Sequence, residues 1–175
     1  MIAAADKLDP RPIYIGVWGG PERKYASIKF FIYTLFGSAL MILSFLALYQ
    51  HGGSFDMRQL RDLSATIPHA TQLLIFGGMF VGFGIKVPMF PFHTWAPTGH
   101  VAAPTGASML LAGVVMKLGA YGCLRVAMPL FPAGFLFWQP VIMWLAVAGI
   151  IYAGFIALVQ DDFKFVIGYS SVSHM

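Results

Sequence analysis

Residues 84–97 read GIKVPMFPFHTWAP, and this stretch decides how the chain folds. It follows an apolar run that starts near Ala70, so a helix crossing a membrane here would have to pass through it. Pro88, Pro91 and Pro97 cannot all lie inside one continuous helix, because proline lacks the backbone N–H and clashes with the preceding turn. The sequence therefore predicts a discontinuous span over residues 70–96, with the helix break at Pro88 and Pro91 and irregular backbone around 87–91.

The composition of the chain indicates that lipid is its solvent. Of the 175 residues, 58% are hydrophobic and 10% are charged, whereas soluble domains carry about 25% charged residues. No Asp, Glu, Lys or Arg occurs in residues 30–55, 63–85, 87–116 or 126–160, and a helix needs roughly 20 apolar residues to cross the hydrocarbon core. Runs such as LLIFGGMFVGF (73–83) lack the alternation typical of a transmembrane β-barrel. We therefore expect an all-α, polytopic helical membrane protein.

The charge-free stretches predict where the helices lie. We expect complete spans at about 26–49, 104–125 and 137–160, besides the broken one at 70–96, and partial spans at 13–18 and 165–175. The polar stretch HGGSFDMRQLRDLSATIPH (51–69) is interpreted as a surface loop. Because both terminal spans are incomplete, residues 1–175 are expected to be a single transmembrane fragment of a larger bundle.

Two lysines lie in apolar stretches that are predicted to cross the membrane. Lys86 and Lys117 are surrounded by apolar residues, and a charged amine at mid-bilayer costs several kcal/mol on insertion scales. Burial favours the neutral form of an amine, so both residues are candidates for a proton relay. The alternative is that each lysine extends to the headgroups or pairs with a carboxylate. That alternative is weaker for Lys117, which lies about 13 residues into its span, at 1.5 Å per residue.

His93, His100 and His174 are further candidates for the relay, because imidazole exchanges protons near neutral pH. For each of them, a hydrogen-bonding role at a helix end is at least as good an interpretation. Their spacing does not match the i, i+4 pattern of a helical zinc site, so we expect no metal. No cluster of Lys and Arg predicts nucleic-acid binding. The chain also lacks a nucleotide-binding glycine fingerprint and an iron–sulfur cysteine set, since Cys123 is its single cysteine.

Three stretches resemble one family. GIKVPMFPFHTWAPTGHVAAPTGASMLLAGVVMKLGAYGCLR (84–125) is similar to the signature region of the antiporter-like subunit M, or chain 4, of respiratory NADH–quinone oxidoreductase (complex I). WGGPERKYASIKFFIYTLFGSALM (18–41) and DDFKFVIGYSSVSHM (161–175) resemble further parts of the same subunit, in the same order. The resemblance implies a fragment that covers about helices five to ten of a fourteen-helix subunit.

In the family that the chain resembles, lysines at the positions of Lys86 and Lys117 belong to a hydrated proton relay coupled to electron transfer. The resemblance also implies other membrane subunits and the lipid bilayer as partners, in the inner membrane. NADH, FMN, iron–sulfur clusters and quinone are expected in partner subunits, with no cofactor and no redox catalysis in this chain. A family glutamate on the fifth helix aligns with Ala5 here, and the family's acidic residues near Thr98 and Ala102 are also replaced.

Two other interpretations stay open at the level of sequence. The same helices occur in Mrp-type cation/proton antiporters and in membrane-bound hydrogenases, which differ in their partners. The chain could also be a nonfunctional structural fragment, because its first and last spans are partial. Whether the chain counts as part of an enzyme depends on these alternatives.

Overall fold

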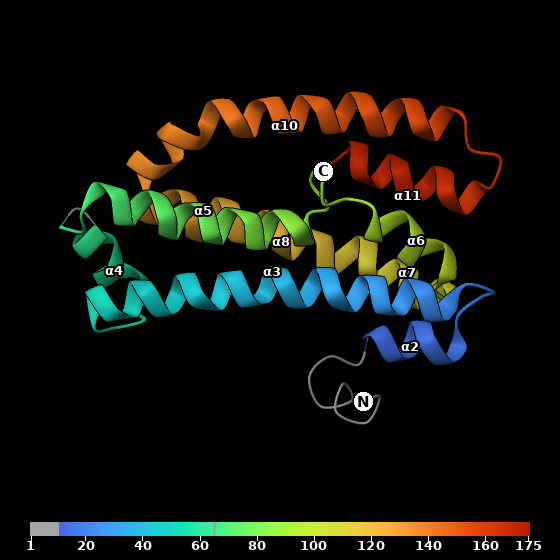
Figure 1. Ribbon diagram of the computed structural model, residues 1–175, viewed down its shortest axis with the longest axis horizontal. Helices are drawn as coiled ribbons and strands as arrows, with labels where there is room; N and C mark the ends of the chain where they lie inside the picture. Colours follow the sequence, from blue (N-terminus) through green and yellow to red (C-terminus); the bar gives the residue numbers. More distant parts are fainter. Residues whose placement is uncertain (1–10, 65) are drawn as a thin grey trace.

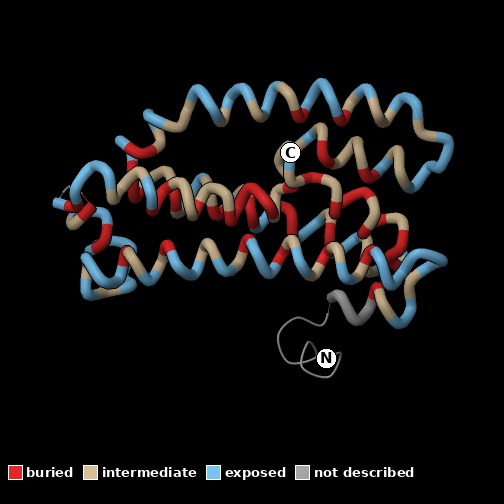
Figure 2. Tube along the Cα trace, in the orientation of Figure 1, coloured by how far each residue is buried: buried red, intermediate tan, exposed pale blue. Residues whose placement is uncertain are grey.

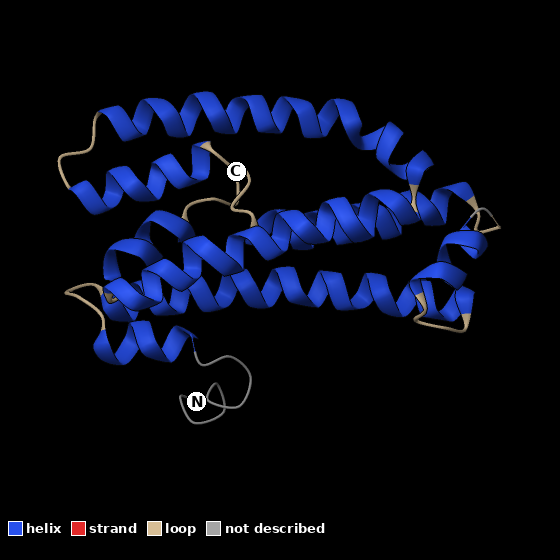
Figure 3. Ribbon diagram, turned by 180° about the vertical axis from the view of Figure 1, so that it is seen from behind, coloured by secondary structure: helices blue, strands red, loops and turns tan. Residues whose placement is uncertain are grey.

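The computed structural model describes residues 11–64 and 66–175, and these residues form helices joined by short turns, without a strand (Figure 3). Ala5, where the family glutamate would align, lies outside the described residues. Within the described part, three helices are long and apolar enough to cross a membrane: Arg23–Gly52, Thr105–Leu130 and Pro132–Leu158. The expectation of a polytopic all-α membrane protein is confirmed.

The long helices run back and forth along the longest axis of the molecule, which is horizontal in Figure 1. Helix α2 (Arg11–Trp18) turns at residues 19–22 into α3 (Arg23–Gly52), which spans the length of the bundle. Helices α5 (His69–Lys86) and α6 (Trp95–Ala102) together return along α3. They are followed by an element that comprises α7 (Thr105–Leu110), α8 (Met116–Gly122) and α9 (Met128–Leu130).

Two π-helical stretches, Leu111–Val115 and Cys123–Ala127, join these last three segments. The chain then crosses again in α10 (Pro132–Leu158) and turns back in α11 (Phe163–Ser173), which packs against α10 and α6. The Asp162 side chain accepts a hydrogen bond from the Lys164 N–H at 2.8 Å and so caps the start of α11.

The helices differ from the predicted spans mainly at their ends. The span predicted at 104–125 continues to Leu130, because Arg125 lies inside the helix instead of ending it. The helix predicted at 137–160 begins at Pro132, since proline is tolerated at the first helical position. The helix predicted at 26–49 is α3, which extends three residues beyond that range at each end. The partial spans predicted at 13–18 and 165–175 correspond to α2 and α11.

The interpretation of residues 51–69 as a loop was wrong in part, because α4 (Met57–Ser64) forms there. The carboxylate of Asp56 accepts from the Arg58 N–H at 2.9 Å, which stabilises the free end of a helix. Leu60 is buried against the bundle while the charged residues stay outside. Ser64 is buried on the same helix, so this polar stretch forms a short surface helix with one side against the bundle.

Helices α3 and α5 approach closely at two glycines, a common device where helices pack in lipid. A Cβ at Gly82 would lie 2.7 Å from the carbonyl oxygen of Gly37, and one at Gly37 would lie 3.2 Å from the carbonyl oxygen of Gly82. The contact places the last turns of α5 in the centre of the bundle, where most residues are buried (Figure 2). The end of α5 is therefore enclosed by neighbouring helices.

Candidate functional site

Helix α5 ends at Lys86, halfway along the bundle, and α6 resumes at Trp95 (Figure 1). Pro88 has no N–H to continue the helical pattern, and the Met89 N–H bonds the Gly84 carbonyl instead, at 2.8 Å. Residues 87–94 form irregular backbone between the two helices. The discontinuous helix that the prolines predicted is therefore present, and it lies in the interior of the bundle.

Three residues attach this irregular segment to the helices around it. The Trp95 indole N–H donates to the Ile85 carbonyl at 2.8 Å, across the break. The Trp95 ring is buried and packs against Phe30 of α3, with ring centroids 5.1 Å apart. The hydroxyls of Tyr33 and Thr94 lie 3.1 Å apart and join α3 to the segment. The contribution of Trp95 was not predicted from the sequence, because nothing in a local pattern shows which carbonyl an indole will reach.

Lys86 is half-buried at the last turn of α5, where it meets α8. A Cβ at Gly119 would lie 3.0 Å from the Lys86 Cβ and 2.9 Å from Cγ2 of Val87. Gly119 is two residues after Lys117, so the backbones that carry the two lysines meet at one level of the bundle. The similar depth expected for Lys86 and Lys117 follows from this contact.

The Lys117 side chain lies on the exposed face of α8, away from the buried Met116 and Gly119. It is the thirteenth residue of the 26-residue helix Thr105–Leu130, counted from Thr105. A π-helical stretch precedes α8 and another follows it, and such stretches are frequent at functional sites. Contact between Lys86 and Lys117 through their amines remains a prediction, because the structure joins them through Gly119.

His100 is buried in α6 and connects that helix to α7. Its Nδ1 lies 2.7 Å from the Ser108 Oγ, while its Nε2 is buried without a hydrogen-bond partner among the described residues. The ammonium of Lys117 lies within electrostatic range of the His100 ring. His100 and Lys117, which the sequence proposed separately, therefore interact electrostatically in the fold.

His93 lies in the irregular segment, inside a group of aromatic rings. Its ring centroid is 5.6 Å from that of Phe90, 5.4 Å from that of Tyr152 and 6.5 Å from that of Tyr169. These rings come from the segment itself, from α10 and from α11. His93 is thus held where three parts of the chain meet, and the two tyrosines are polar neighbours that the sequence analysis did not identify.

His174 lies apart from the other two histidines, just after α11. It is exposed, and its Nδ1 lies 2.7 Å from the Ser170 carbonyl oxygen of its own helix. This contact is the local, helix-end arrangement that was the alternative to a relay role. In the described residues no hydrogen bond joins His174 to His93 or His100.

The described carboxylates all lie away from the break, in turns or in the short helix α4: Glu22, Asp56, Asp62, Asp161 and Asp162. The described bundle interior therefore carries lysine and histidine without a carboxylate of its own. No group of three or more metal-ligating side chains occurs within the described residues.

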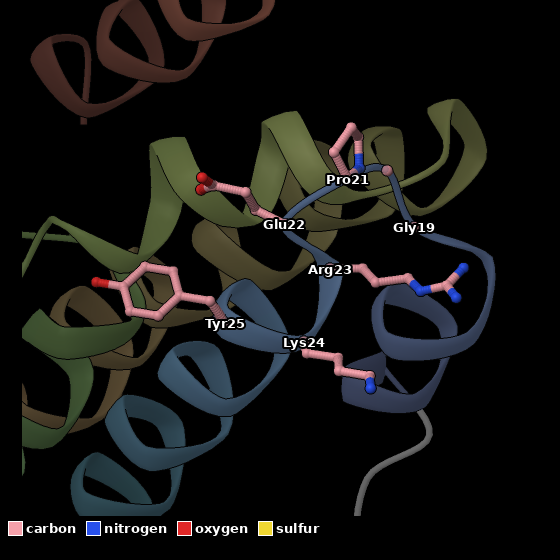
Figure 4. A pocket seen from close by; sticks show the side chains of 7 residues that line it. Gly19, Pro21, Glu22, Arg23, Lys24 and Tyr25 are labelled. Carbon is pink, nitrogen blue, oxygen red and sulfur yellow. The ribbon is translucent and has the colours of Figure 1, made fainter.

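Two hollows occur on the surface of the described residues. One of about 910 Å³ is lined by residues 19–25, in the turn between α2 and α3. Figure 4 shows that Arg23 and Lys24 point to one side of this turn whereas Glu22 and Tyr25 point away from them. Another hollow, of about 660 Å³, lies on the apolar side of α10 beside Tyr152. Neither has converging polar groups, so the break and the residues around it remain the candidate site.

Known proteins share the sequence and the fold of this chain. The family described as "NADH:quinone oxidoreductase/Mrp antiporter, TM" matches residues 11–175. NADH-quinone oxidoreductase subunit M of Rickettsia bellii is 46% identical over 168 residues, covering 96% of this chain and 34% of the relative. NADH-ubiquinone oxidoreductase chain 4 of Prototheca wickerhamii is 46% identical over 171 residues, covering 96% of this chain and 32% of the relative.

Solved structures give the same result for the fold. A chain of respiratory complex I from Thermus thermophilus superposes with a TM-score of 0.82 and 32% identity, covering 94% of this chain and 35% of that one. A chain of the archaeal membrane-bound sulfane sulfur reductase shares the fold, with a TM-score of 0.78 at 21% identity, covering 93% of this chain and 34% of that one. The chain spans about a third of the length of the relatives it matches. The family resemblance seen in the sequence is confirmed, and the chain belongs to the NADH:quinone oxidoreductase/Mrp antiporter transmembrane family.

Proposed function

We propose that the intact protein is a membrane subunit of a proton-translocating NADH–quinone oxidoreductase of the inner membrane. Relatives named as subunit M or chain 4 of that enzyme match 96% of this chain. The partners would be other membrane subunits of the complex. NADH, FMN, iron–sulfur clusters and quinone would be held by partner subunits, and the redox reaction would occur there.

One observation indicates which residues would conduct protons. Gly119 brings α8 against Lys86 at the break, so two lysine-bearing segments meet halfway along the bundle. Irregular backbone at membrane depth is tolerated where it is enclosed by protein or lines a water-filled cavity. An ammonium ion is costly there and is expected to serve an ion or proton pathway. In this proposal Lys86 and Lys117 take up and release protons.

The histidines would extend the pathway on either side of the lysines. His100 is near Lys117 and has one buried nitrogen without a described partner. His93 lies in the break next to Tyr152 and Tyr169. His174 is the weakest member, because its ring nitrogen contacts its own helix. A carboxylate to balance Lys117 would come from the rest of the protein, against the exposed face of α8.

The test is Lys117→Ala in the full-length subunit, assembled in its complex and studied in inverted membrane vesicles. Electron transfer from NADH should continue, while the number of protons moved per electron should fall. Lys24→Ala is the matched control, because Lys24 is an exposed lysine at the end of the bundle and should leave this ratio unchanged. An unaltered proton-to-electron ratio in Lys117→Ala would refute the proposed role of Lys117.

An Mrp-type antiporter is the second candidate, because the family description includes both kinds of protein. The two differ in what drives proton movement. Vesicles carrying an antiporter would acidify or alkalise in response to added Na⁺ without NADH. Vesicles carrying the proposed subunit would respond to NADH.

A further inference from the structure

The carbonyl groups at the end of α5 show how the helix break is stabilised. In a regular helix each N–H bonds the carbonyl four residues earlier, and the Val87 N–H still does so, with the Phe83 carbonyl at 2.9 Å. Pro88 has no N–H to donate to the Gly84 carbonyl. The Met89 N–H takes over the Gly84 carbonyl at 2.8 Å, five residues earlier.

This shift has a consequence for Ile85. Met89 is the residue whose N–H would bond the Ile85 carbonyl in a regular helix, and its N–H is now engaged elsewhere. The Trp95 indole N–H donates to the Ile85 carbonyl at 2.8 Å and replaces the missing backbone donor. A side chain ten residues away thus completes the hydrogen bonding that Pro88 disrupts.

The position of this bond makes it difficult to replace. Ile85 and Trp95 are both 0% exposed, and the indole is packed against Phe30. A buried carbonyl that loses its donor also loses the compensation for its removal from water. The indole bond is therefore the local interaction that holds the end of α5 to the start of α6.

We propose that Trp95 is a positioning residue that sets the geometry of the break, and with it the placement of Lys86 and His93. Lys86 follows the residue that Trp95 bonds, and His93 precedes Trp95 by two residues in the same segment. Tyr33 of α3 contacts the same segment through Thr94. This inference rests on the proposed function, because it concerns groups assigned to the proton relay.

The first test is Trp95→Phe in the full-length subunit within its complex. Phenylalanine keeps an aromatic ring and removes the N–H donor. Proton translocation per electron should fall and its pH profile should change, with electron transfer retained. Trp138→Phe is the matched control, since the Trp138 indole donates to the Leu73 carbonyl at 3.3 Å, away from the break. It should leave both the ratio and the profile unchanged.

The second test measures opening of the break directly, by hydrogen exchange of peptides covering residues 83–96 in the assembled complex. Loss of one hydrogen bond of about 1 kcal/mol corresponds to a roughly five-fold increase in opening. Trp95→Phe should raise exchange by about that factor, and the Trp138→Phe control should not.

A double-mutant cycle with Pro88→Ala separates the hydrogen bond from packing. Alanine restores an N–H at position 88, so residue 88 can bond Gly84 and Met89 becomes free to bond Ile85. In that background Trp95→Phe should produce little further exchange, because Ile85 no longer depends on the indole. Equal effects of Trp95→Phe in both backgrounds would overturn the inference and leave only a packing role for Trp95.

These outcomes are distinguishable from failure of the proposed function. If Lys117→Ala leaves the proton ratio unchanged, the relay assignment fails, while the exchange results still decide whether Trp95 holds the break. If Lys117→Ala lowers the ratio and Trp95→Phe changes neither the ratio nor exchange, the relay stands and the role of Trp95 is wrong.

Discussion

Prolines have opposite effects in two regions of this molecule. At Pro88 the helix is interrupted: α5 ends at Lys86, and eight residues of irregular backbone, 87–94, separate it from α6. At Pro140 the helix continues, and α10 runs for 27 residues with the proline inside it. The first turns of α10 are inclined to the rest of the helix, but they are not separated from it (Figure 3).

The surroundings explain the difference. Proline at position 140 cannot bond the Leu136 carbonyl, and Leu136 lies exposed on an apolar helix. At the break, by contrast, the Met89 N–H bonds the Gly84 carbonyl and the Trp95 indole N–H bonds the Ile85 carbonyl. A proline therefore bends a helix that faces outward, and it separates two helices where neighbouring groups stabilise the open form.

The largest expected effect comes from filling the contact between α8 and the break. In Gly119→Ala the new methyl would lie 2.9 Å from Val87 and 3.0 Å from both the Phe83 carbonyl oxygen and the Lys86 Cβ. We expect a loss of about 1–3 kcal/mol, the usual range for overpacking. It should appear as a lower dissociation temperature of the purified complex, together with reduced proton translocation.

Gly113→Ala is the control on the same membrane-spanning element, because a Cβ at Gly113 meets nothing within 4 Å among the described residues. It should leave stability unchanged or raise it, by up to about 1 kcal/mol from helix propensity. Equal losses for the two variants would show that Gly119 is not a special contact.

Much of the fold could be predicted because it depends on local patterns. Charge-free stretches of the right length identify the long helices, and Pro88 and Pro91 mark the interruption of the helix that begins at His69. Helix α4 was missed because its polar composition resembles a loop, and the burial of Leu60 and Ser64 in the structure shows that it packs. The two π-helical stretches leave no recognisable pattern in the residues.

The candidate site could be predicted only in part. An intramembrane lysine is conspicuous in any sequence, so Lys86 and Lys117 were identified from their apolar surroundings. The approach of the α8 backbone to Lys86 at Gly119 and the electrostatic interaction between His100 and Lys117 depend on tertiary packing. From the sequence alone, Trp95 is indistinguishable from any other aromatic residue of a protein core. Its role follows from a hydrogen bond across ten residues, which no periodicity indicates.

A smaller effect is expected where the proline does not break the helix. Pro140→Ala restores an N–H that can bond the Leu136 carbonyl, and it removes a clash within α10. The dissociation temperature of the complex should therefore stay the same or rise, and proton translocation should not change. Pro88→Ala should lower translocation, because it permits a continuous helix at the break. A similar loss for both variants would contradict the contrast between the two regions.

The smallest effect is expected on the outward side of α10. Trp144 is 75% exposed in an apolar helix, and neither its ring nor its indole N–H has a described partner. Trp144→Leu keeps the surface apolar, so its effect on stability should stay within about 0.5 kcal/mol, as for other surface substitutions.

Trp95→Leu, which makes the same chemical change at the break, should reduce both stability and proton translocation, because it removes the buried ring and the donor to Ile85. Measuring the dissociation temperature of both variant complexes compares the break with the outward side of α10, because the substitution is Trp to Leu in each. If Trp144→Leu proved as damaging as Trp95→Leu, this side of α10 would have to be a packed contact with another part of the protein and not a lipid-facing surface.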